Sequence, residues 1–223
     1  MKAVILIAGV GSRLGKNFPK CLTKLSNGET ILQRQLGFLQ PHVKEVIGVV
    51  GYKKEFIMEL YPEILYVYNP IYITTNTSKS LLAGLRAIEP DDVLWINGDV
   101  VCTENALKQI IEAEGNVVAV DYTTCGEEEV KFTLDAQNNI KEISKQVTKA
   151  LGEAVGINKI SRADFVIFTE MLEACADDDY FEKAIELCIE QGVQFKPVDV
   201  GNGTCIEVDF AEDLGRAEDL IIR

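Results

Sequence analysis

The segment that most constrains this chain lies at its start, where an apolar strand runs directly into a glycine-rich loop. Residues 3–7 read AVILI, and glycines follow at positions 9, 11 and 15. A strand that ends at Ala8 and Gly9 leaves backbone N–H groups unpaired, and glycines let these groups turn toward an anion. Cationic side chains at positions 13, 16 and 20 can close on the same charge. The segment therefore predicts a phosphate site at the end of a buried strand.

Two common phosphate motifs do not fit the spacing of this loop. A Walker loop has four residues between its first glycine and Gly-Lys-Ser/Thr, but here Gly9 lies too far from Gly15, Gly11 lies too close, and Asn17 follows Lys16. The dinucleotide fingerprint has a third glycine where this chain has Leu14. An ordinary glycine-rich connection between a strand and a helix, with surface cations, is the remaining structural alternative.

The pattern along the rest of the chain predicts an α/β fold. Apolar runs bounded by turn residues alternate with segments of helical period, as in a mainly parallel sheet with helices on its faces. We expect strands at 3–7, 45–50, 64–68, 92–97, 117–122, 154–160, 193–200 and 205–208. We expect helices near 30–40, 78–88, 104–114, 163–175 and 180–191, a short helix from about 53 and a final helix from 211. Segments 130–134 and 140–144 alternate around a polar turn and predict an antiparallel hairpin. The expectation is a single Rossmann-like domain over 1–223, with a mixed, mostly parallel sheet and a hairpin insertion.

Composition excludes several classes of function. The 223 residues include 22 basic and 35 acidic side chains, a net charge of -13, which argues against a nucleic-acid or membrane partner. No apolar run approaches the ~18 residues of a membrane span, and no leader with a cleavage site is evident, so we expect a cytoplasmic protein. The six cysteines form no C-x-x-C pair, and His42 is the single histidine. A zinc site and a histidine base are therefore not expected.

Two aspartates are candidate metal ligands. Asp99 follows the expected strand 92–97 in the sequence Asn97-Gly98-Asp99, and a carboxylate at such a strand end suits Mg²⁺. Asp209 follows the late strand 205–208 and is the second candidate. Its alternative role is a helix cap, because Glu212 stands three residues later. We expect Glu207 to face the opposite side of the strand, and we rank it lower.

The glycine loop, taken together with Pro19 and Lys20, resembles the opening of the nucleotidyltransferases that activate phosphorylated sugars and alcohols with a nucleoside triphosphate. Their pattern, L-x-A-G-x-G-x-R-x-G followed by P-K, is filled here by Leu6, Ala8, Gly9, Gly11, Arg13, Gly15, Pro19 and Lys20. The resemblance implies a GT-A-like nucleotidyltransferase fold. It implies catalytic roles on the triphosphate for Arg13 and Lys20, and Mg²⁺ as cofactor on Asp99 and Asp209. The residues implied at the nucleotide are Leu6, Ala8, Gly9, Gly11, Ser12, Asn76, Ser80 and Asn97.

The absence of a histidine base is consistent with this chemistry. A phosphate monoester or phosphonate acceptor is already anionic at neutral pH, so its attack on the α-phosphorus needs positioning and charge neutralisation rather than proton removal.

Two segments indicate the kind of acceptor. The sugar-activating members have Glu-Lys-Pro where this chain has Ser144-Lys145-Gln146, and they have a glycine-rich loop at residues 76–81. These departures make the chain more similar to phosphocholine and aminoethylphosphonate cytidylyltransferases. That resemblance implies an acceptor-binding elaboration at about 125–160 and 177–192, with Lys145 as a phosphate ligand. The other implied acceptor residues are Asp121, Glu153, Tyr180 and Glu182, for which a helix cap or a solvated surface acid is the alternative role.

The expected partners are thus a nucleoside triphosphate, with CTP favoured, and a small phosphorylated or phosphonylated alcohol. A sugar-1-phosphate or inositol-phosphate nucleotidyltransferase is the nearest alternative. A glycosyltransferase that uses a nucleotide sugar and a non-catalytic nucleotide-binding regulator are more distant ones. The sequence leaves open the choice between CTP and UTP, the use of one or two metal ions, and the oligomeric state, with a homodimer among the options.

Overall fold

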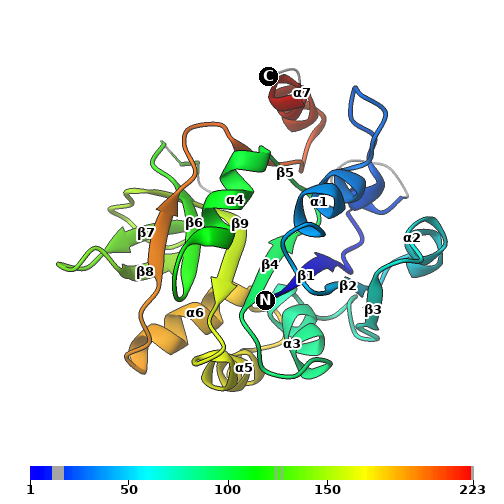
Figure 1. Ribbon diagram of the computed structural model, residues 1–223. Helices are drawn as coiled ribbons and strands as arrows, with labels where there is room; N and C mark the ends of the chain where they lie inside the picture. The colour runs from blue at the N-terminus through cyan, green and yellow to red at the C-terminus, as the bar shows by residue number, and fades with distance from the viewer. Residues whose placement is uncertain (12–17, 124, 127, 222–223) are drawn as a thin grey trace.

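The computed structural model describes residues 1–11, 18–123, 125–126 and 128–221 (Figure 1). The strands are β1 (Lys2–Ile7), β2 (Val46–Val50), β3 (Leu65–Tyr68), β4 (Val93–Asn97), β5 (Val100–Cys102), β6 (Val117–Asp121), β7 (Lys131–Leu134), β8 (Ile140–Ser144), β9 (Gly152–Ile160), β10 (Lys196–Asp199) and β11 (Cys205–Glu207). The helices are α1 (Ile31–Leu39), α2 (Lys54–Leu60), α3 (Thr77–Arg86), α4 (Glu104–Glu112), α5 (Phe165–Ala174), α6 (Phe181–Glu190) and α7 (Ala211–Ile221), with a 3₁₀ turn, η2, at Lys20–Leu22.

The main sheet of the described residues is mixed, in the order β10-β6-β9-β4-β1-β2-β3. Strands β4, β1, β2 and β3 are parallel, and so are β10 and β6. Strand β9 runs antiparallel between β4 and β6, and the hairpin β7–β8 joins the sheet through β9. The single α/β domain with a mixed sheet and an antiparallel hairpin is therefore confirmed.

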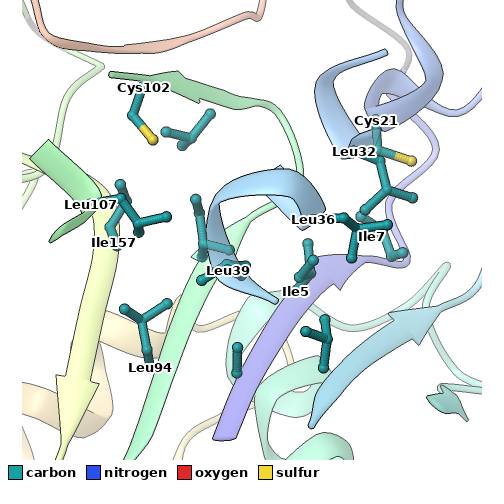
Figure 2. Packing of buried hydrophobic residues seen from close by; sticks show 14 of the residues in the cluster. Ile5, Ile7, Cys21, Leu32, Leu36, Leu39, Leu94, Cys102, Leu107 and Ile157 are labelled. Atoms are coloured by element: carbon teal, nitrogen blue, oxygen red, sulfur yellow. The ribbon is translucent and has the colours of Figure 1, made fainter. Parts of the chain in front are cut away.

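Helices cover both faces of this sheet because the strand residues are apolar on both sides. In β1, Ala3, Ile5 and Ile7 pack with α1 and α4, while Val4 and Leu6 pack with α3, α5 and α6 on the other face. Figure 1 shows α3, α5 and α6 together at the lower side of the view. Figure 2 shows the first face from close by, with Leu36 and Leu39 of α1 above Ile5 of β1. Two buried layers therefore hold the strand ends in fixed positions.

A two-stranded sheet that the pattern did not predict lies beside the main one. Strand β5 has only three residues and pairs antiparallel with β11, with Cys102 opposite Cys205. It follows β4 after a two-residue turn, so that sequence periodicity gives no separate signal for it. Its core, which includes Val101, Ile206 and Val208, is covered by α7. This small sheet brings the residue before β5, Asp99, close to the end of β11.

Other differences from the expected elements are small. Strand β10 begins at Lys196 rather than at 193, because residues 191–195 complete the turn after α6 and bury Phe195 in the core. Strand β9, which falls in the segment expected as an acceptor-binding elaboration, lies between β6 and β4 in the main sheet. None of the helices in the described residues is long and apolar enough to cross a membrane.

Candidate active site

A cleft of about 510 Å³ opens at the carboxyl ends of β1 and β4. It brings together most of the residues expected at a nucleotide: Leu6, Ala8, Gly9, Gly11, Asn76, Ser80 and Asn97 all line it. Ser12 and Arg13 lie outside the described residues. The position of the cleft is the one that open α/β sheets favour for ligands, because the strand ends and the loops beyond them diverge there.

Lys20 enters this cleft from the start of η2, and Gly11 makes room for it. Gly11 has a φ of +64°, and a Cβ at this position would lie 2.6 Å from Cγ of Lys20. A side chain at position 11 would therefore be strained and would also displace the lysine stem. Gly98 directly follows β4, and a Cβ there would lie 2.2 Å from Cγ2 of Ile7 and 2.8 Å from the Leu6 carbonyl oxygen. Gly11 thus lets the backbone approach Lys20, and Gly98 lets the chain after β4 pass close to β1.

The Lys20 ammonium joins the two aspartates expected to hold a metal. Its Nζ donates to Oδ2 of Asp99 at 3.1 Å and to Oδ1 of Asp209. Asp99 follows β4 and Asp209 follows β11, and the N–H of Val208 donates to the Asp99 carbonyl at 3.0 Å. Burial raises the pKa of Asp99, and the charge of Lys20 opposes this shift. Burial alone would lower the pKa of Lys20, but the charges of Asp99 and Asp209 raise it above its usual value.

These two carboxylates fit a divalent cation that also binds phosphates. Lys20 shows that both can contact one cation at the same time. In the described part of the chain, no group of three or more His, Cys, Asp or Glu side chains is placed to hold a metal ion. A site with two protein carboxylates is what Mg²⁺ uses when phosphate oxygens and water supply its other ligands.

The Asp209 side chain points into the cleft, where its carboxylate contacts Lys20. The side chain of Asp213, in the first turn of α7, accepts from the N–H groups of Asp209 at 3.1 Å and Phe210 at 2.8 Å, the two residues before the helix. These bonds hold the chain that carries Asp209 against the start of α7, and a helix cap and a metal ligand stay compatible roles for Asp209.

The expectation that Glu207 faces away from the site was wrong. Glu207 lines the cleft, and Nδ2 of Asn97 donates to its Oε1 at 2.9 Å. Glu207 is the last residue of β11, and Asp209, two residues later, lines the same cleft. Glu207 is open to the solvent of the cleft, but protein atoms surround it densely. This partial desolvation raises the pKa of Glu207 to about 8, and the charge of Asp99 adds to the shift.

Four of the acceptor residues expected from the sequence line the same cleft, and we call the part of the cleft that they form the acceptor half. They are Lys145, Glu153, Tyr180 and Glu182. Nζ of Lys145 lies 5.0 Å from the centre of the Tyr180 ring and 3.5 Å from Oε2 of Glu128. Burial raises the pKa of Glu182 to about 7, although Lys145 lowers it. Burial and the charges of Glu129 and Asp121 raise the pKa of Glu153.

Asp121 is the one expected acceptor residue in the described chain that does not line the cleft. It is 5% exposed, and its Oδ2 accepts from the N–H of Gly203 at 3.1 Å. Its partner across the sheet is Glu153 on β9. The Asp121 side chain thus stabilises the turn after β10, so the acceptor role expected for it does not fit its position.

Several residues of the cleft are not among the predicted site residues. Tyr72, Thr75 and Thr77 line it, and so do Glu128, Glu129 and Arg216. Residues 72–77 precede or begin α3 and could have been found from the helix start alone. Arg216 comes from the last helix, more than 200 residues after β1, and only the folded chain places it there.

Solved structures of known proteins share this fold. CTP:phosphocholine cytidylyltransferase (LicC) from Streptococcus pneumoniae superposes with a TM-score of 0.82 at 18% identity, over 99% of this chain and 98% of that one. The inositol-1-phosphate CTP transferase from T. maritima gives 0.80 at 18% identity, over 98% and 95%. HddC from Yersinia pseudotuberculosis gives 0.75 at 19% identity, over 99% of both chains.

Curated relatives match in sequence. CMP-5'-(3-aminopropyl)phosphonate synthase of Streptomyces rubellomurinus is 38% identical over 130 residues, which are 53% of this chain and 20% of the relative. The bifunctional protein GlmU of Methanococcus maripaludis is 28% identical over 203 residues, 86% of this chain and 48% of the relative. The chain therefore spans less than half the length of these two relatives. The model of the MobA-like NTP transferase domain matches residues 3–164, and the chain belongs to this family.

Proposed function

We propose that the protein transfers a cytidylyl group from CTP to a small phosphorylated or phosphonylated alcohol, with Mg²⁺ as cofactor and pyrophosphate as the second product. The observation that carries the proposal is the convergence of Asp99 and Asp209 on one cation, Lys20, inside the cleft that begins at the glycine loop. Carboxylates in this arrangement suit a metal bound to phosphates rather than a proton transfer.

Each half of the cleft has a part in the reaction. An oxygen of the acceptor phosphate or phosphonate forms a bond to the α-phosphorus, and the bond from this phosphorus to the bridging oxygen of pyrophosphate breaks. Lys20 offsets charge on the triphosphate, and Arg13 is proposed to do the same. Asp99 and Asp209 would hold Mg²⁺, which supplies charge neutralisation at the phosphates. No protein base is required, because the acceptor oxygen already carries its charge.

The choice of CTP and of a small acceptor has separate support. The relative with the highest identity quoted above is named for a CMP-phosphonate product, and two structural neighbours are named for CTP-dependent reactions. The acceptor half carries five carboxylates, Glu128, Glu129, Glu153, Glu182 and Glu207, among the described residues. Such a lining suits an acceptor with a cationic group better than a neutral hexose.

An inositol phosphate is the second candidate acceptor. It is favoured by the neighbour from T. maritima, whose name specifies inositol-1-phosphate and CTP. An inositol ring presents hydroxyl groups and no positive charge, so the carboxylates of the acceptor half would have to accept hydrogen bonds without charge pairing. The two candidates therefore differ in the charge of the group that this half of the cleft binds.

The proposal is tested by pyrophosphate release with Mg²⁺ and each of the four ribonucleoside triphosphates. The acceptors are phosphoethanolamine, phosphocholine, 2-aminoethylphosphonate, inositol-1-phosphate and glucose-1-phosphate. We expect release with CTP and one of the cationic acceptors. Release with no pair would contradict the transferase assignment. A preference for UTP and glucose-1-phosphate would overturn the acceptor assignment and the choice of base.

A further inference from the structure

The Asn69 side chain, directly after β3, fixes the hydrogen bonds of two hydroxyl groups. Asn69 is 2% exposed, and the backbone N–H of Ile71 donates to its Oδ1 at 3.1 Å. A backbone N–H can only donate, so this bond settles which end of the amide is the oxygen. The other end, Nδ2, donates to Oγ of Ser80 at 3.1 Å and to Oγ1 of Thr75 at 3.3 Å.

This amide decides which of the two hydroxyl groups keeps an O–H to donate. Thr75 donates its own O–H to the Ile71 carbonyl at 2.9 Å, so its hydroxyl has both a donor and an acceptor. In the described part of the chain, the Ser80 hydroxyl makes one hydrogen bond, in which it accepts from Asn69. Ser80 is 7% exposed and lines the cleft. Its O–H is therefore left to donate, and an acceptor on a ligand in the cleft would complete the network.

The wall of the cleft around Ser80 is uncharged. The side chains that line the cleft there are Tyr72, Thr75, Asn76, Thr77 and Ser80. Lys79, the one charged residue of the segment 72–80, donates instead to the carbonyl groups of Leu172, Glu173 and Cys175 near the end of α5. A neutral wall with hydrogen-bonding groups suits the base of a nucleotide, whereas the phosphates meet Lys20. We call this wall, together with Ala8 and Gly9, the nucleotide half of the cleft.

We propose, on the basis of the function proposed above, that the Ser80 hydroxyl donates to N3 of cytosine, and that Asn69 is the positioning residue that makes this hydroxyl a donor. The two pyrimidine bases differ at this ring atom, because N3 is an acceptor in cytosine and carries a hydrogen in uracil. With uracil, Ser80 would have to accept from N3–H, and its own O–H would be left without an acceptor. The network of Asn69 thus selects CTP over UTP.

Calorimetric measurement of nucleotide binding with Mg²⁺ tests this contact without an acceptor substrate. We expect the wild-type protein to bind CTP at least about tenfold more tightly than UTP, and likewise than 3-deazacytidine triphosphate, in which C–H replaces N3. In Ser80→Ala, CTP and the 3-deaza analogue should bind equally. Equal wild-type affinities for CTP and this analogue would overturn the inference and leave the transferase assignment intact. If none of the four nucleoside triphosphates binds, the proposed function itself is wrong.

Asn69→Asp tests the positioning role, because an ionised carboxylate has the shape of the amide but only accepts hydrogen bonds. Ser80 would then donate to position 69 and present a lone pair to the base. At about pH 8, where the carboxyl group is ionised, we expect the preference for CTP over UTP to fall at least about tenfold. An unchanged preference would reject the role of Asn69.

The ratio of the two dissociation constants separates this effect from a loss of stability, which weakens the binding of both nucleotides alike. Ser78→Ala is the matched control and should keep the wild-type ratio, because Ser78 is buried two residues before Ser80 and is not among the residues that line the described cleft. The comparison of CTP with its 3-deaza analogue uses the wild-type protein, so it does not depend on the folding of any variant.

Discussion

At the scale of single residues, the centre of the site is a pair of carboxylates that share one ammonium. Asp99 and Asp209 both contact Nζ of Lys20, so each carboxylate keeps a positive partner when the other is neutralised. We expect Asp99→Asn and Asp209→Asn to fold, because each replacement preserves shape and leaves one carboxylate for Lys20. Each should lower kcat for pyrophosphate release by at least about 100-fold, since a ligand of the metal is lost.

Thermal unfolding separates this role from a structural one. Mg²⁺ and CTP at about 100 times their dissociation constant should raise the Tm of the wild-type protein by about 5–10 °C. In Asp99→Asn and Asp209→Asn we expect CTP to give the same small shift with and without Mg²⁺. Asp219→Asn, on the exposed side of α7, is the control and should retain the full shift. A full Mg²⁺-dependent shift in both site variants would show that the metal is held elsewhere.

Gly156 is the second residue whose replacement the geometry makes predictable. It has a φ of +71°, and a Cβ there would lie 2.7 Å from Oε1 of Glu207 and 2.9 Å from Nδ2 of Asn97. We expect Gly156→Ala to destabilise the fold by more than about 1 kcal/mol through backbone strain. It should also displace the Asn97–Glu207 pair and lower kcat/KM by about 100-fold, because small shifts of a site are costly. Urea unfolding and pyrophosphate release measure the two effects.

Gly192→Ala is the matched control for this change. Gly192 has a φ of +86° after the end of α6, and no atom lies within 4 Å of the position that its Cβ would take. The variant should show the loss of stability from strain and keep its kcat/KM. If the two variants lose equal activity, the effect of Gly156→Ala is a consequence of stability alone.

At the scale of elements, the site depends on how the start of α3 contacts the start of α6. The N–H of Phe181 donates to Oγ1 of Thr77 at 3.1 Å, and the N–H of Asn76 donates to the carbonyl of Asp177 at 2.8 Å. Nδ2 of Asn76 also donates to the carbonyl of Asp178. These bonds fix the nucleotide half of the cleft relative to the turn that carries Tyr180 and Glu182.

Removal of one of these bonds should affect the acceptor more than the nucleotide. Thr77→Val preserves the volume of the side chain but leaves the first N–H of α6 without its acceptor, at a cost of about 1 kcal/mol. We expect this loss in urea unfolding and an increase of about fivefold in KM for the acceptor, since Glu182 lies in the same turn. Thr169→Val, whose hydroxyl donates to Phe165 within α5, is the control. A larger change in KM for CTP than for the acceptor would contradict this account.

The elements that could be predicted from the sequence are those whose periodicity extends over several residues. The hairpin β7–β8 was found because two alternating segments flank a polar turn, and Asp135 indeed accepts from the N–H groups of Gln137 and Asn139 there. Strand β5 was missed because three residues do not define a period. Its pairing with β11 has a sequence separation of about 100 residues and is decided by tertiary packing under α7.

At the scale of the whole molecule, the sequence predicts which strand ends form the cleft better than it predicts which side chains line it. The strand ends place Gly9, Gly11, Asp99 and Asp209 along one cleft, and this follows from the α/β pattern. The role proposed for Asp121 failed because the turn after β10 covers that strand end and takes its carboxylate. No local pattern could show this, since Gly203 is 82 residues away. The carboxylates of the acceptor half likewise come from β9, β11, α6 and the segment before β7.

The burial of the Glu182 carboxyl group should make the free protein less stable as the pH rises. Burial raises the pKa of Glu182 to about 7 from its ordinary 4.5, so the folded state binds this proton more tightly than the unfolded state. The stability of the wild-type protein should therefore fall between about pH 4.5 and pH 7, and the full penalty is present above pH 7. Glu182→Gln removes this penalty, which amounts to about 3 kcal/mol at most.

Urea unfolding at pH 5 and pH 8 measures this effect. We expect Glu182→Gln to be more stable than the wild-type protein, with an advantage about 2 kcal/mol larger at pH 8 than at pH 5. Glu190→Gln, which is exposed, should show no such difference between the two pH values. If the Glu182 carboxylate stabilised the fold, Glu182→Gln would instead be less stable than the wild-type protein. Increased stability together with weaker acceptor binding in the same variant is the behaviour of a buried charge retained for a cationic ligand.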